Sequence, residues 1–423
     1  MSSSAPIVTL MLRSVANRKV TAALTVLAIA FSVALLLGVE KIRTEARASF
    51  ANTISGTDLI VGARSGSVQL LLYSVFRIGN ATNNISWKSY EEIASHPKIA
   101  WTIPISLGDS HRGYRVMGTT QDYFEHYAYA RTRKLEFAQG RMFEDVYDAV
   151  LGADVARELG YALAQEIVVA HGAGAVNILK HKDKPFRVAG ILKRTGTPVD
   201  RTVHVSLEGI EAMHIDWKAG VPVPGEQVSA VDAAAMDLSP KAITAFLVGL
   251  ESKVGVFAVQ RKVNDYRKEP LLAILPGVAL QELWDVMSVA ERSLLVISAF
   301  VVVTGLVGML AMILASLNER RREMAILRSV GARPAHIFAL LMGEAVGFAL
   351  AGCILGVALL YVVLLIAQPI VETKFGLFLS VSMLKPYDFA VLGVVTLAGF
   401  VLGLVPGYRA YRRSLADGMM IRV

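Results

Sequence analysis

Four long stretches of the chain contain no Asp, Glu, Lys or Arg, and no other feature limits its fold so strongly. They are residues 20–39, 293–317, 345–371 and 389–408. A helix needs roughly 20 apolar residues to cross the hydrocarbon core of a bilayer, and each stretch is long enough. A buried helix of a soluble protein is rarely so long and so free of charge. The sequence therefore predicts four transmembrane α-helices.

The composition requires a second, more polar part. Of the 423 residues, 54% are hydrophobic and 18% are charged, which is too apolar for an ordinary soluble protein and too charged for membrane helices alone. Residues 40–292, between the first two spans, are long enough to form a domain with its own core. The one cysteine, Cys353, lies in the third span, so no disulfide can stabilise that domain.

Basic residues gather on one side of the predicted spans. Cytoplasmic segments of membrane proteins carry an excess of Lys and Arg close to the spans. The short loop 372–388 contains only two lysines, so we expect it to lie outside together with residues 40–292. Both termini and the connection between the second and third spans are then cytoplasmic. Their basic residues are Arg13, Arg18, Lys19, Arg320, Arg321, Arg322, Arg328, Arg333, Arg409, Arg412, Arg413 and Arg422.

The net charge of +8 follows from this distribution. Residues 40–292 contain equal numbers of acidic and basic residues, so the positive charge does not lie on the inserted domain. A nucleic-acid-binding protein concentrates its positive charge on the folded domain. We therefore expect no nucleic-acid partner.

A cleavable signal peptide is the alternative for the first span. Residues 46–48, Ala-Arg-Ala, have the small-x-small form of a cleavage site. However, the apolar run of residues 20–39 is longer than a usual signal core, and the candidate site lies well beyond its end. We expect a retained membrane anchor.

Both ends of residues 40–292 show helical spacing next to the spans. Residues 41–55 continue from the first span, and residues 279–295 place apolar side chains at helical spacing before the second. We expect both spans to continue outward as stalk helices; the alternative is an interfacial turn at each end. Between them, β-branched and aromatic runs alternate with short helical stretches, which predicts an α+β domain. The expected strands are 58–63, 99–108, 114–119, 166–172, 186–192 and 202–207, the expected helices 87–95, 153–159 and 240–250, and the expected loop 221–237.

The predicted fold class is a membrane protein with four transmembrane α-helices and a large α+β extracytoplasmic domain inserted between the first and second. Along the chain, the segments alternate between the cytoplasm, the membrane and the outside. They are a cytoplasmic tail (1–19), the first span (20–39), the extracytoplasmic domain with stalk helices at both ends (40–292), the second span (293–317), a cytoplasmic coupling helix and turn (318–336), the third span (337–371), an external loop (372–388), the fourth span (389–408) and a cytoplasmic tail (409–423).

The common catalytic and nucleotide-binding motifs are absent from the sequence. It contains no G-x-x-x-x-G-K-[ST] phosphate loop, no H-E-x-x-H, no paired C-x-x-C and no G-x-S-x-G. We therefore expect no catalytic residue, no enzyme activity and no cofactor on this chain. The histidines number 8 and none pair at i, i+4, so surface or core positions are favoured over a metal site assembled by folding, and no metal ligand is predicted.

Glycines recur every four residues in the third and fourth spans. This spacing places them on one helix face and permits the close approach of another helix. For the third span, packing within the chain and contact with a second chain fit equally well; for the fourth we favour contact with a second chain. These predicted packing residues are Gly352, Gly356, Gly399, Gly403 and Gly407.

The connection between the second and third spans carries a dense cluster of charges. Met324, Leu327 and Val330 lie at i, i+3 and i+6 and form an apolar strip between charged faces. Gly331 is placed to end this helix and Pro334 to begin the next. A plain positive-inside anchor needs neither interleaved glutamates nor an apolar strip, so a helix that docks into a protein groove is favoured. Its predicted contact residues are Glu319, Arg320, Arg321, Arg322, Glu323, Met324, Leu327 and Arg328.

The sequence E-R-R-R-E-M-A-I-L-R-S-V-G-A, residues 319–332, resembles the cytoplasmic loop of the FtsX-, MacB- and LolC-like ABC transporter permeases. Residues 140–161 and 186–208 resemble the MacB-type periplasmic core domain, and residues 405–419 resemble the C-terminal tail of the family. The order of one span, a large external domain and three further spans is also that of the family. Residues 56–87 depart from the MacB pattern.

The resemblance implies a permease that works with two copies of a separate ABC ATP-binding subunit, which would bind ATP and Mg²⁺. It also implies pairing with a second copy or a homologous permease, in the bacterial inner membrane with a periplasmic domain. MacB carries its ATPase at the N-terminus, and we expect none on this chain. In this family ATP-driven motion passes through the stalks to the external domain, and residues 319–328 would be the coupling helix.

Three functions fit these features. The favoured one is a permease that moves or extracts a lipid-linked or periplasmic substrate, with membrane lipid and a periplasmic protein or lipoprotein as further partners. The alternative is an FtsX-like scaffold that activates a periplasmic partner or hydrolase. An independent membrane enzyme is disfavoured by the missing catalytic motifs. The sequence indicates neither the substrate nor the direction of movement.

Overall fold

The computed structural model describes residues 18–130, 132–172, 181–218, 221–222, 227–319, 321–375 and 382–412. The chain divides into two compact units. The helix unit comprises Met1–Glu45, Ser288–Pro369 and Ser380–Val423, and the sheet unit comprises Ala46–Met287 and Ile370–Leu379.

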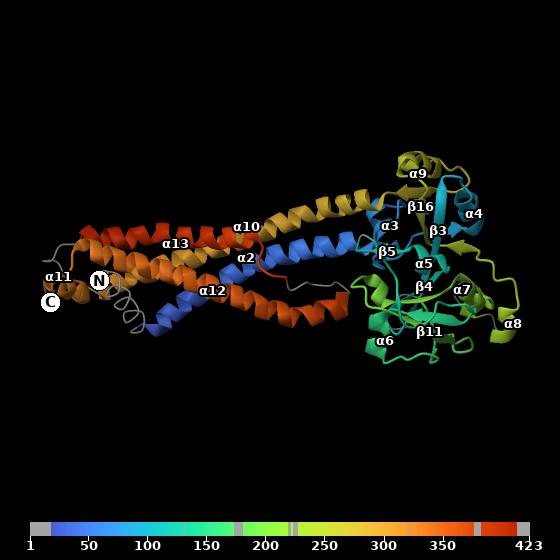
Figure 1. Ribbon diagram of the computed structural model, residues 1–423, viewed down its shortest axis with the longest axis horizontal. Coiled ribbons are helices and arrows are strands. Elements are labelled where there is room, and N and C mark those ends of the chain that lie inside the picture. The colour runs from blue at the N-terminus through green and yellow to red at the C-terminus, as the bar shows by residue number, and fades with distance from the viewer. Residues whose placement is uncertain are drawn as a thin grey trace. The chain divides into compact units, whose positions relative to one another are not determined.

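Four long helices make up most of the helix unit, and each contains one of the uncharged stretches (Figure 1). Each is long and apolar enough to cross a membrane. The first two extend well beyond their uncharged stretches, so each contributes residues to both units. A short fifth helix, α11, lies between the second and third of them. The helices are α2 (Lys19–Thr53), α10 (Pro276–Glu319), α11 (Arg321–Ser329), α12 (Pro334–Phe375) and α13 (Pro386–Arg412).

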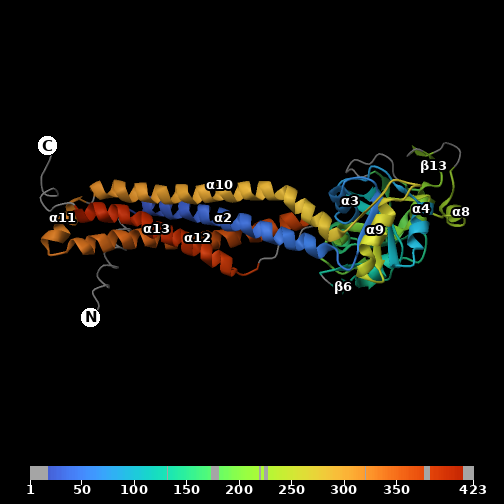
Figure 2. The ribbon, with the colours of Figure 1, turned by 90° about the horizontal axis from the view of Figure 1, so that it is seen from above.

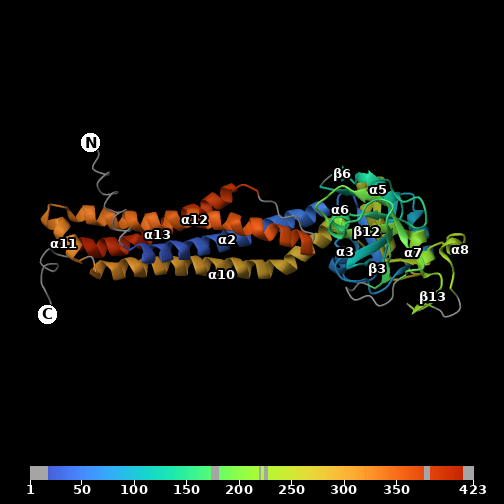
Figure 3. The same cartoon turned by 90° about the horizontal axis from the view of Figure 1, so that it is seen from below.

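The four long helices run alongside one another and share one apolar core (Figures 2 and 3). Each contributes buried side chains to it, among them Ile29 of α2, Met309 of α10, Ala345 of α12 and Val395 of α13. Large apolar side chains also cover the outside of the helices; Phe300, for example, is 68% exposed. A helix that is apolar on every face is typical of a membrane span, because lipid covers the side that faces away from the protein core.

An 11-stranded sheet forms the framework of the sheet unit. The strand order is β17-β1-β16-β3-β4-β12-β8-β11-β7, with β10 paired to β3 and β9 paired to β11. The β4–β12 and β8–β11 pairs are parallel, and the other pairs of this sheet are antiparallel. The strands are β1 (Leu59–Ala63), β3 (Ile99–His111), β4 (Tyr114–Thr119), β7 (Phe137–Gly140), β8 (Asp148–Leu151), β9 (Glu166–Ile167), β10 (Ala170–His171), β11 (Phe186–Leu192), β12 (Thr202–Ser206), β16 (Ala245–Leu250) and β17 (Leu271–Ile274).

Short helices and two-residue strands complete the sheet unit, with α4 beside β3, α9 beside β17 and β1, α6 beside β11, and α7 beside β4 and β12 (Figure 1). Together with the four membrane helices, this arrangement confirms the predicted fold class. The helices are α3 (Ser67–Ser74), α4 (Trp87–Ala94), α5 (Asp122–His126), α6 (Ala153–Leu159), α7 (Leu207–His214), α8 (Ala230–Ala234), α9 (Val256–Asn264), η1 (Pro198–Arg201) and η2 (Lys253–Gly255), and the short strands are β2 (Ile85–Ser86), β5 (Ala128–Tyr129), β6 (Arg133–Lys134), β13 (Trp217–Lys218), β14 (Val221–Pro222) and β15 (Ala242–Ile243).

Each predicted strand region contains a strand, but the helix predicted at residues 240–250 is wrong. These residues form β15 and β16. β16 lies between β1 and β3, and its burial pattern shows five buried residues followed by a half-buried one. Because both faces of the strand are covered, its sequence is apolar throughout and lacks the alternation that identifies a half-exposed strand. The predicted loop 221–237 likewise contains α8.

The ends of α2 and α10 that lie in the sheet unit are part of its core. Ile54, directly after α2, and Leu280, in the first turns of α10, are both buried there. Phe50 of α2 packs edge-on against Trp284 of α10, with the ring centroids 5.4 Å apart. The two helices are therefore attached to each other and to the sheet at this end.

Candidate functional site

α11 lies at the end of the helix unit where α12 begins (Figure 1), and it ends in a glycine turn. Gly331 has a φ of 100°, a left-handed conformation that glycine adopts without strain. Its amide donates to the carbonyl of Arg328 (3.0 Å), and the amide of Ala332 donates to that of Leu327 (2.9 Å). These are the hydrogen bonds of a Schellman motif. Pro334 then begins α12, so the turn predicted from Gly331 and Pro334 is present.

The apolar residues of α11 face in two directions. Met324 is half-buried and packs against the core of the helix unit, and Leu327 is also half-buried. Ile326 and Val330 are instead 62% and 83% exposed. The strip expected from Met324, Leu327 and Val330 therefore does not form one exposed face, because the helix packs on its own bundle through part of that strip. The exposed apolar surface consists of Ile326 of α11 and Val330 directly after the helix, which lie four residues apart.

Arg328 connects α11 to α13. Its Nη2 donates a hydrogen bond to the main-chain carbonyl of Tyr411 at 3.3 Å. Of the predicted coupling residues that the structure describes, Glu323 is exposed, whereas Met324, Leu327 and Arg328 are half-buried. The side chains of Glu319, Arg320, Arg321 and Arg322 lie outside the described part of the chain.

Each predicted packing glycine contacts a neighbouring helix of the same chain. A Cβ atom on Gly403 would lie 2.7 Å from the Cβ of Ala345 on α12, which is closer than such atoms approach. Glycine therefore permits the two backbones to pack closely. On α13 this face is occupied by α12, whereas the sequence favoured contact with a second chain. The glycines facing α12 are Gly399, Gly403 and Gly407, and those facing α2 are Gly352 and Gly356.

Polar contacts join the helices beyond the uncharged stretch of α2. The buried Lys41 donates from Nζ to the main-chain carbonyl of Ser382 (2.5 Å) and to its hydroxyl (2.9 Å). Arg43 lies 2.6 Å from Glu40 and 3.9 Å from Glu291 of α10. These contacts connect α2 both to α10 and to the segment before α13, so the helices are held together as a group.

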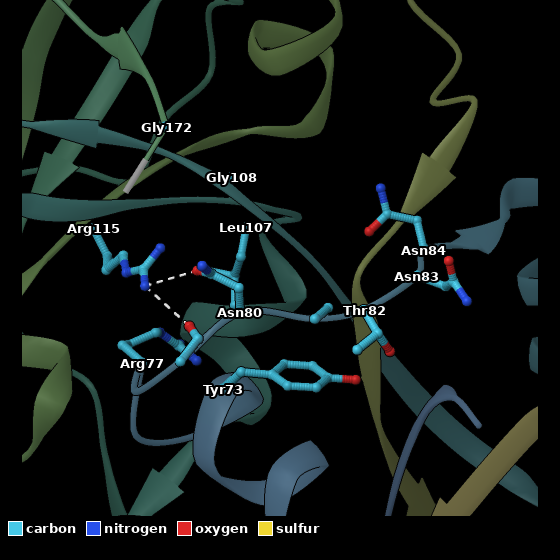
Figure 4. A pocket seen from close by; sticks show the side chains of 12 residues that line it. Tyr73, Arg77, Asn80, Thr82, Asn83, Asn84, Leu107, Gly108, Arg115 and Gly172 are labelled. Carbon is cyan, nitrogen blue, oxygen red and sulfur yellow. Dashed lines mark hydrogen bonds between the residues drawn. The ribbon is translucent and has the colours of Figure 1, made fainter. Parts of the chain in front are cut away.

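A polar cavity of about 490 Å³ lies in the sheet unit (Figure 4). Arg115 of β4 donates from Nη2 to the carbonyl of Gly79 (3.0 Å) and to the side-chain oxygen of Asn80 (2.9 Å) in its wall. Burial, and then the nearby Arg77, lower the pKa of Arg115. Guanidinium and amide groups of this kind suit a polar or anionic ligand. Residues 79–84 of the wall lie between α3 and β2.

Three histidines and an aspartate meet in the sheet unit, next in sequence to two residues of this cavity, Gly108 and Gly172. Asp109 of β3 and His171 of β10 are cross-strand partners, and Nδ1 of His171 lies 3.1 Å from Oδ1 of Asp109. Nε2 of His214, the last residue of α7, lies 3.5 Å from the same oxygen. The two histidine nitrogens are 3.2 Å apart.

The remaining member of this cluster, His181, is completely buried. Burial lowers its pKa to about 4, so the ring is neutral near pH 7. Burial raises the pKa of Asp109, but the hydrogen bonds with His171 and His214 outweigh it and lower the pKa to about 2. Sequence spacing did not identify the cluster, because its members come from separate elements that only the folded sheet brings together.

Two protein families match the chain. Residues 22–266, more than half of the chain, match the family described as the MacB-like periplasmic core domain. Residues 295–415 match the family described as the FtsX-like permease C-terminal. The first match covers most of α2 and of the sheet unit, and the second begins within α10 and covers α11, α12 and α13.

Curated relatives are similar over most of this chain. The macrolide export ATP-binding/permease protein MacB of Shewanella oneidensis is 23% identical over 335 residues, which cover 76% of this chain and 46% of the relative. The protein of the same name from Shewanella sp. strain ANA-3 is 22% identical over 340 residues, with the same coverage of 76% and 46%. The chain thus spans about half the length of the curated relatives it matches.

Solved structures of extracytoplasmic domains are also similar. The periplasmic region of MacB from Actinobacillus actinomycetemcomitans aligns with a TM-score of 0.33 at 12% identity, covering 55% of this chain and 94% of that one. The extracellular domain of the noncanonic ABC-type transporter YknZ from Gram-positive bacteria aligns with a TM-score of 0.31 at 13% identity, covering 52% and 99%.

Proposed function

Because the chain belongs to the MacB- and FtsX-like ABC transporter permeases, we propose that it transmits ATP-driven motion of a separate ATP-binding subunit to its sheet unit. The sheet unit then moves or extracts a lipid-linked or periplasmic substrate. ATP and Mg²⁺ act on the partner, and this chain supplies no catalytic residue. The complex contains two ATP-binding subunits and two permease chains, identical or homologous. In the inner membrane, both termini and α11 face the cytoplasm and the sheet unit faces the periplasm.

The length of α10 is the observation on which this proposal depends. The helix runs for 44 residues, from Pro276 to Glu319. Its first turns are buried in the core of the sheet unit, and α11 begins two residues after its end. At 1.5 Å per residue, a helix of this length is about 66 Å long. In this proposal a force applied at α11 reaches the sheet unit through one continuous helix.

Helix α2 supports the same mechanism. It joins α10 in the sheet unit through Phe50 and Trp284, and in the helix unit through Arg43 and Glu291. The hydroxyl of Ser32 adds a hydrogen bond to the carbonyl of Val301 at 3.1 Å. Because the two helices are connected at several levels, they would move together and not slide past one another.

The exposed surface of α11 suits a protein groove. Ile326 and Val330 provide apolar contact, and the exposed Glu323 provides charge beside it. Amphipathic helices commonly dock into apolar grooves through residues spaced three or four apart. We therefore place the ATP-binding subunit against Ile326 and Val330, and assign to Arg328 the role of holding α11 on α13.

The first test is the substitution Ile326→Asp in the full-length chain. Placing a charge in the proposed contact should reduce recovery of an ATP-binding subunit with the tagged chain by at least about 10-fold, because a buried unpaired charge is strongly unfavourable. The measurement is affinity purification from detergent-solubilised source membranes, followed by mass spectrometry for proteins with a G-x-x-x-x-G-K-[ST] motif.

The matched control is Val231→Asp, since Val231 is 80% exposed on α8 of the sheet unit. It should recover the ATP-binding subunit as the unchanged chain does. Equal recovery with Ile326→Asp would contradict the proposed contact. The same purification separates the alternatives: a lipoprotein or bound lipid supports transport, and a cell-wall hydrolase supports the scaffold function.

A further inference from the structure

His181 of the sheet unit has no hydrogen-bond partner for its side chain in the described part of the protein. The residue is completely buried, and neither Nδ1 nor Nε2 is bonded. Its backbone N–H donates to the carbonyl of Val169 (3.0 Å), which holds it beside β10. Buried polar atoms nearly always have a partner, so a buried imidazole with both nitrogens unpaired is typical of a side chain that binds a ligand.

The neighbouring atoms have the spacing of metal ligands. Nδ1 of His171 lies 3.1 Å from Oδ1 of Asp109, Nε2 of His214 lies 3.5 Å from it, and the two nitrogens are 3.2 Å apart. Tetrahedral ligands at the usual zinc distances of 2.0–2.1 Å are about 3.3 Å from one another. Each His181, His171 and His214 ring also offers an atom within 4.8 Å of the others.

The surroundings of His214 orient its ring for a metal. Nδ1 of His214 lies 2.9 Å from the main-chain carbonyl of Ile210, so Nδ1 carries the proton and donates it. The lone pair of the neutral ring is then on Nε2, the atom that points to Asp109 and His171. Histidine ligands of metals commonly donate their other N–H to a carbonyl in this way.

A hydrogen-bonded cluster without a metal explains only part of these observations. If Nδ1 of His171 carries a proton, it can donate hydrogen bonds to Oδ1 of Asp109 and to Nε2 of His214. It leaves both nitrogens of His181 unpaired. A metal ion held by His171, His181 and His214 would bond one nitrogen of His181, and Asp109 lies within 3.5 Å of the nitrogens of His171 and His214.

We propose that Asp109, His171, His181 and His214 bind one divalent transition-metal ion of the Zn²⁺ class. Three imidazoles and one carboxylate suit zinc and its neighbours in the first transition series, whereas Mg²⁺ and Ca²⁺ prefer oxygen ligands alone. His171 is 40% exposed and provides the route to solvent, so the ion can enter and leave without unfolding of the domain. The proposal does not depend on the ATP-driven mechanism.

The test is metal binding by the full-length chain in detergent, purified without a polyhistidine tag. After EDTA treatment and removal of the chelator, Zn²⁺ is titrated against a chromophoric competitor, and Co²⁺ is titrated separately. We expect one Zn²⁺ per chain, a rise in thermal melting temperature, and the intense visible absorption of tetrahedral Co²⁺.

The variants His214→Ala and Asp109→Asn should each weaken Zn²⁺ binding by about 100-fold or more, because each removes a ligand or its charge. His171→Gln changes the exposed histidine of the cluster. This variant should fold even if removal of a buried ligand prevents folding. His96→Ala, which changes a half-buried histidine outside the cluster, is the matched control and should bind like the unchanged chain.

The proposal is overturned if the unchanged chain binds no stoichiometric Zn²⁺, or if His171→Gln and His214→Ala bind it as tightly as His96→Ala does. A Co²⁺ spectrum typical of six oxygen ligands would also overturn it. Recovery of the ATP-binding subunit with His171→Gln should remain unchanged, so failure of this proposal is distinguishable from failure of the proposed function.

Discussion

His204 shows how single side chains make the sheet unit sensitive to acid. It lies on β12, and its imidazole is completely buried. Burial, and then the positive charge of Arg77, lower its pKa to about 3. Nδ1 lies 3.2 Å from the carbonyl of Val150 and donates its proton there. The ring is therefore neutral in the folded protein, whereas an unfolded chain would protonate it near pH 6.5.

We predict that acidification destabilises the chain through His204. Its folded pKa of about 3 is below the unfolded value, so between these two pKa values the unfolded state binds more protons and stability falls as pH falls. From pH 7 to pH 5 the loss should be about 2 kcal/mol, since one pKa unit corresponds to about 1.4 kcal/mol. The measurement is denaturant unfolding of the full chain at both pH values.

The variant His204→Gln keeps a donor near Val150 but does not titrate, so its stability should depend less on pH by about that amount. His336→Gln changes an exposed histidine of α12 and should retain the full dependence. An unchanged pH dependence in His204→Gln would show that another group is responsible.

At the scale of elements, the packing of α13 on α12 depends on three glycines of one helix face. Gly399, Gly403 and Gly407 leave space for Ala349, Ala345 and Phe338 of α12. Gly393 lies on α13 as well, but nothing is within 4 Å of the position of its Cβ. A packed glycine and an open glycine on the same helix can therefore be compared. The comparison distinguishes the effect of close packing from the effect of helix propensity.

We predict that Gly403→Leu lowers the thermal stability of the chain in detergent and Gly393→Leu does not. A side chain at position 403 must displace Ala345 and push the helices apart. At position 393 the leucine has open space, and helix propensity favours it over glycine by about 1 kcal/mol. Equal melting temperatures for the two variants would contradict the role of close packing.

At the scale of the whole molecule, two helices belong to both units. α2 contributes residues up to Glu45 to the helix unit and from Ala46 to the sheet unit, and α10 changes units between Met287 and Ser288. A break in either helix near these positions would interrupt the continuous helix on which the proposed mechanism depends.

We predict that Val286→Pro keeps binding of the ATP-binding subunit but abolishes the effect of ATP on the sheet unit. Val286 is 75% exposed, so its replacement loses little packing, but proline inside a helix removes a hydrogen bond and kinks the helix. The variant should still recover the ATP-binding subunit. ATP with vanadate should change hydrogen–deuterium exchange of the sheet unit in the unchanged chain and in Val286→Ala, and not in Val286→Pro. If ATP with vanadate changed hydrogen–deuterium exchange of the sheet unit in Val286→Pro as it does in the unchanged chain, transmission through α10 would be contradicted.

The sequence alone determined the features that depend on short stretches of chain. The four spans follow from uncharged length, and the turn after α11 follows from Gly331 and Pro334. Most strands follow from β-branched and aromatic runs between turns. In each case the physical cause lies within about 20 neighbouring residues, so it can be read without knowing the fold.

Only the tertiary structure decided which distant residues meet. β16 is a strand because β1 and β3 cover both of its edges, although its uniformly apolar sequence also fits a helix. Met324 turns inward because α11 packs on its own bundle. Asp109 meets His171 across a strand pair and His214 at the end of α7, because contacts between residues far apart in sequence are set by the global packing of the chain.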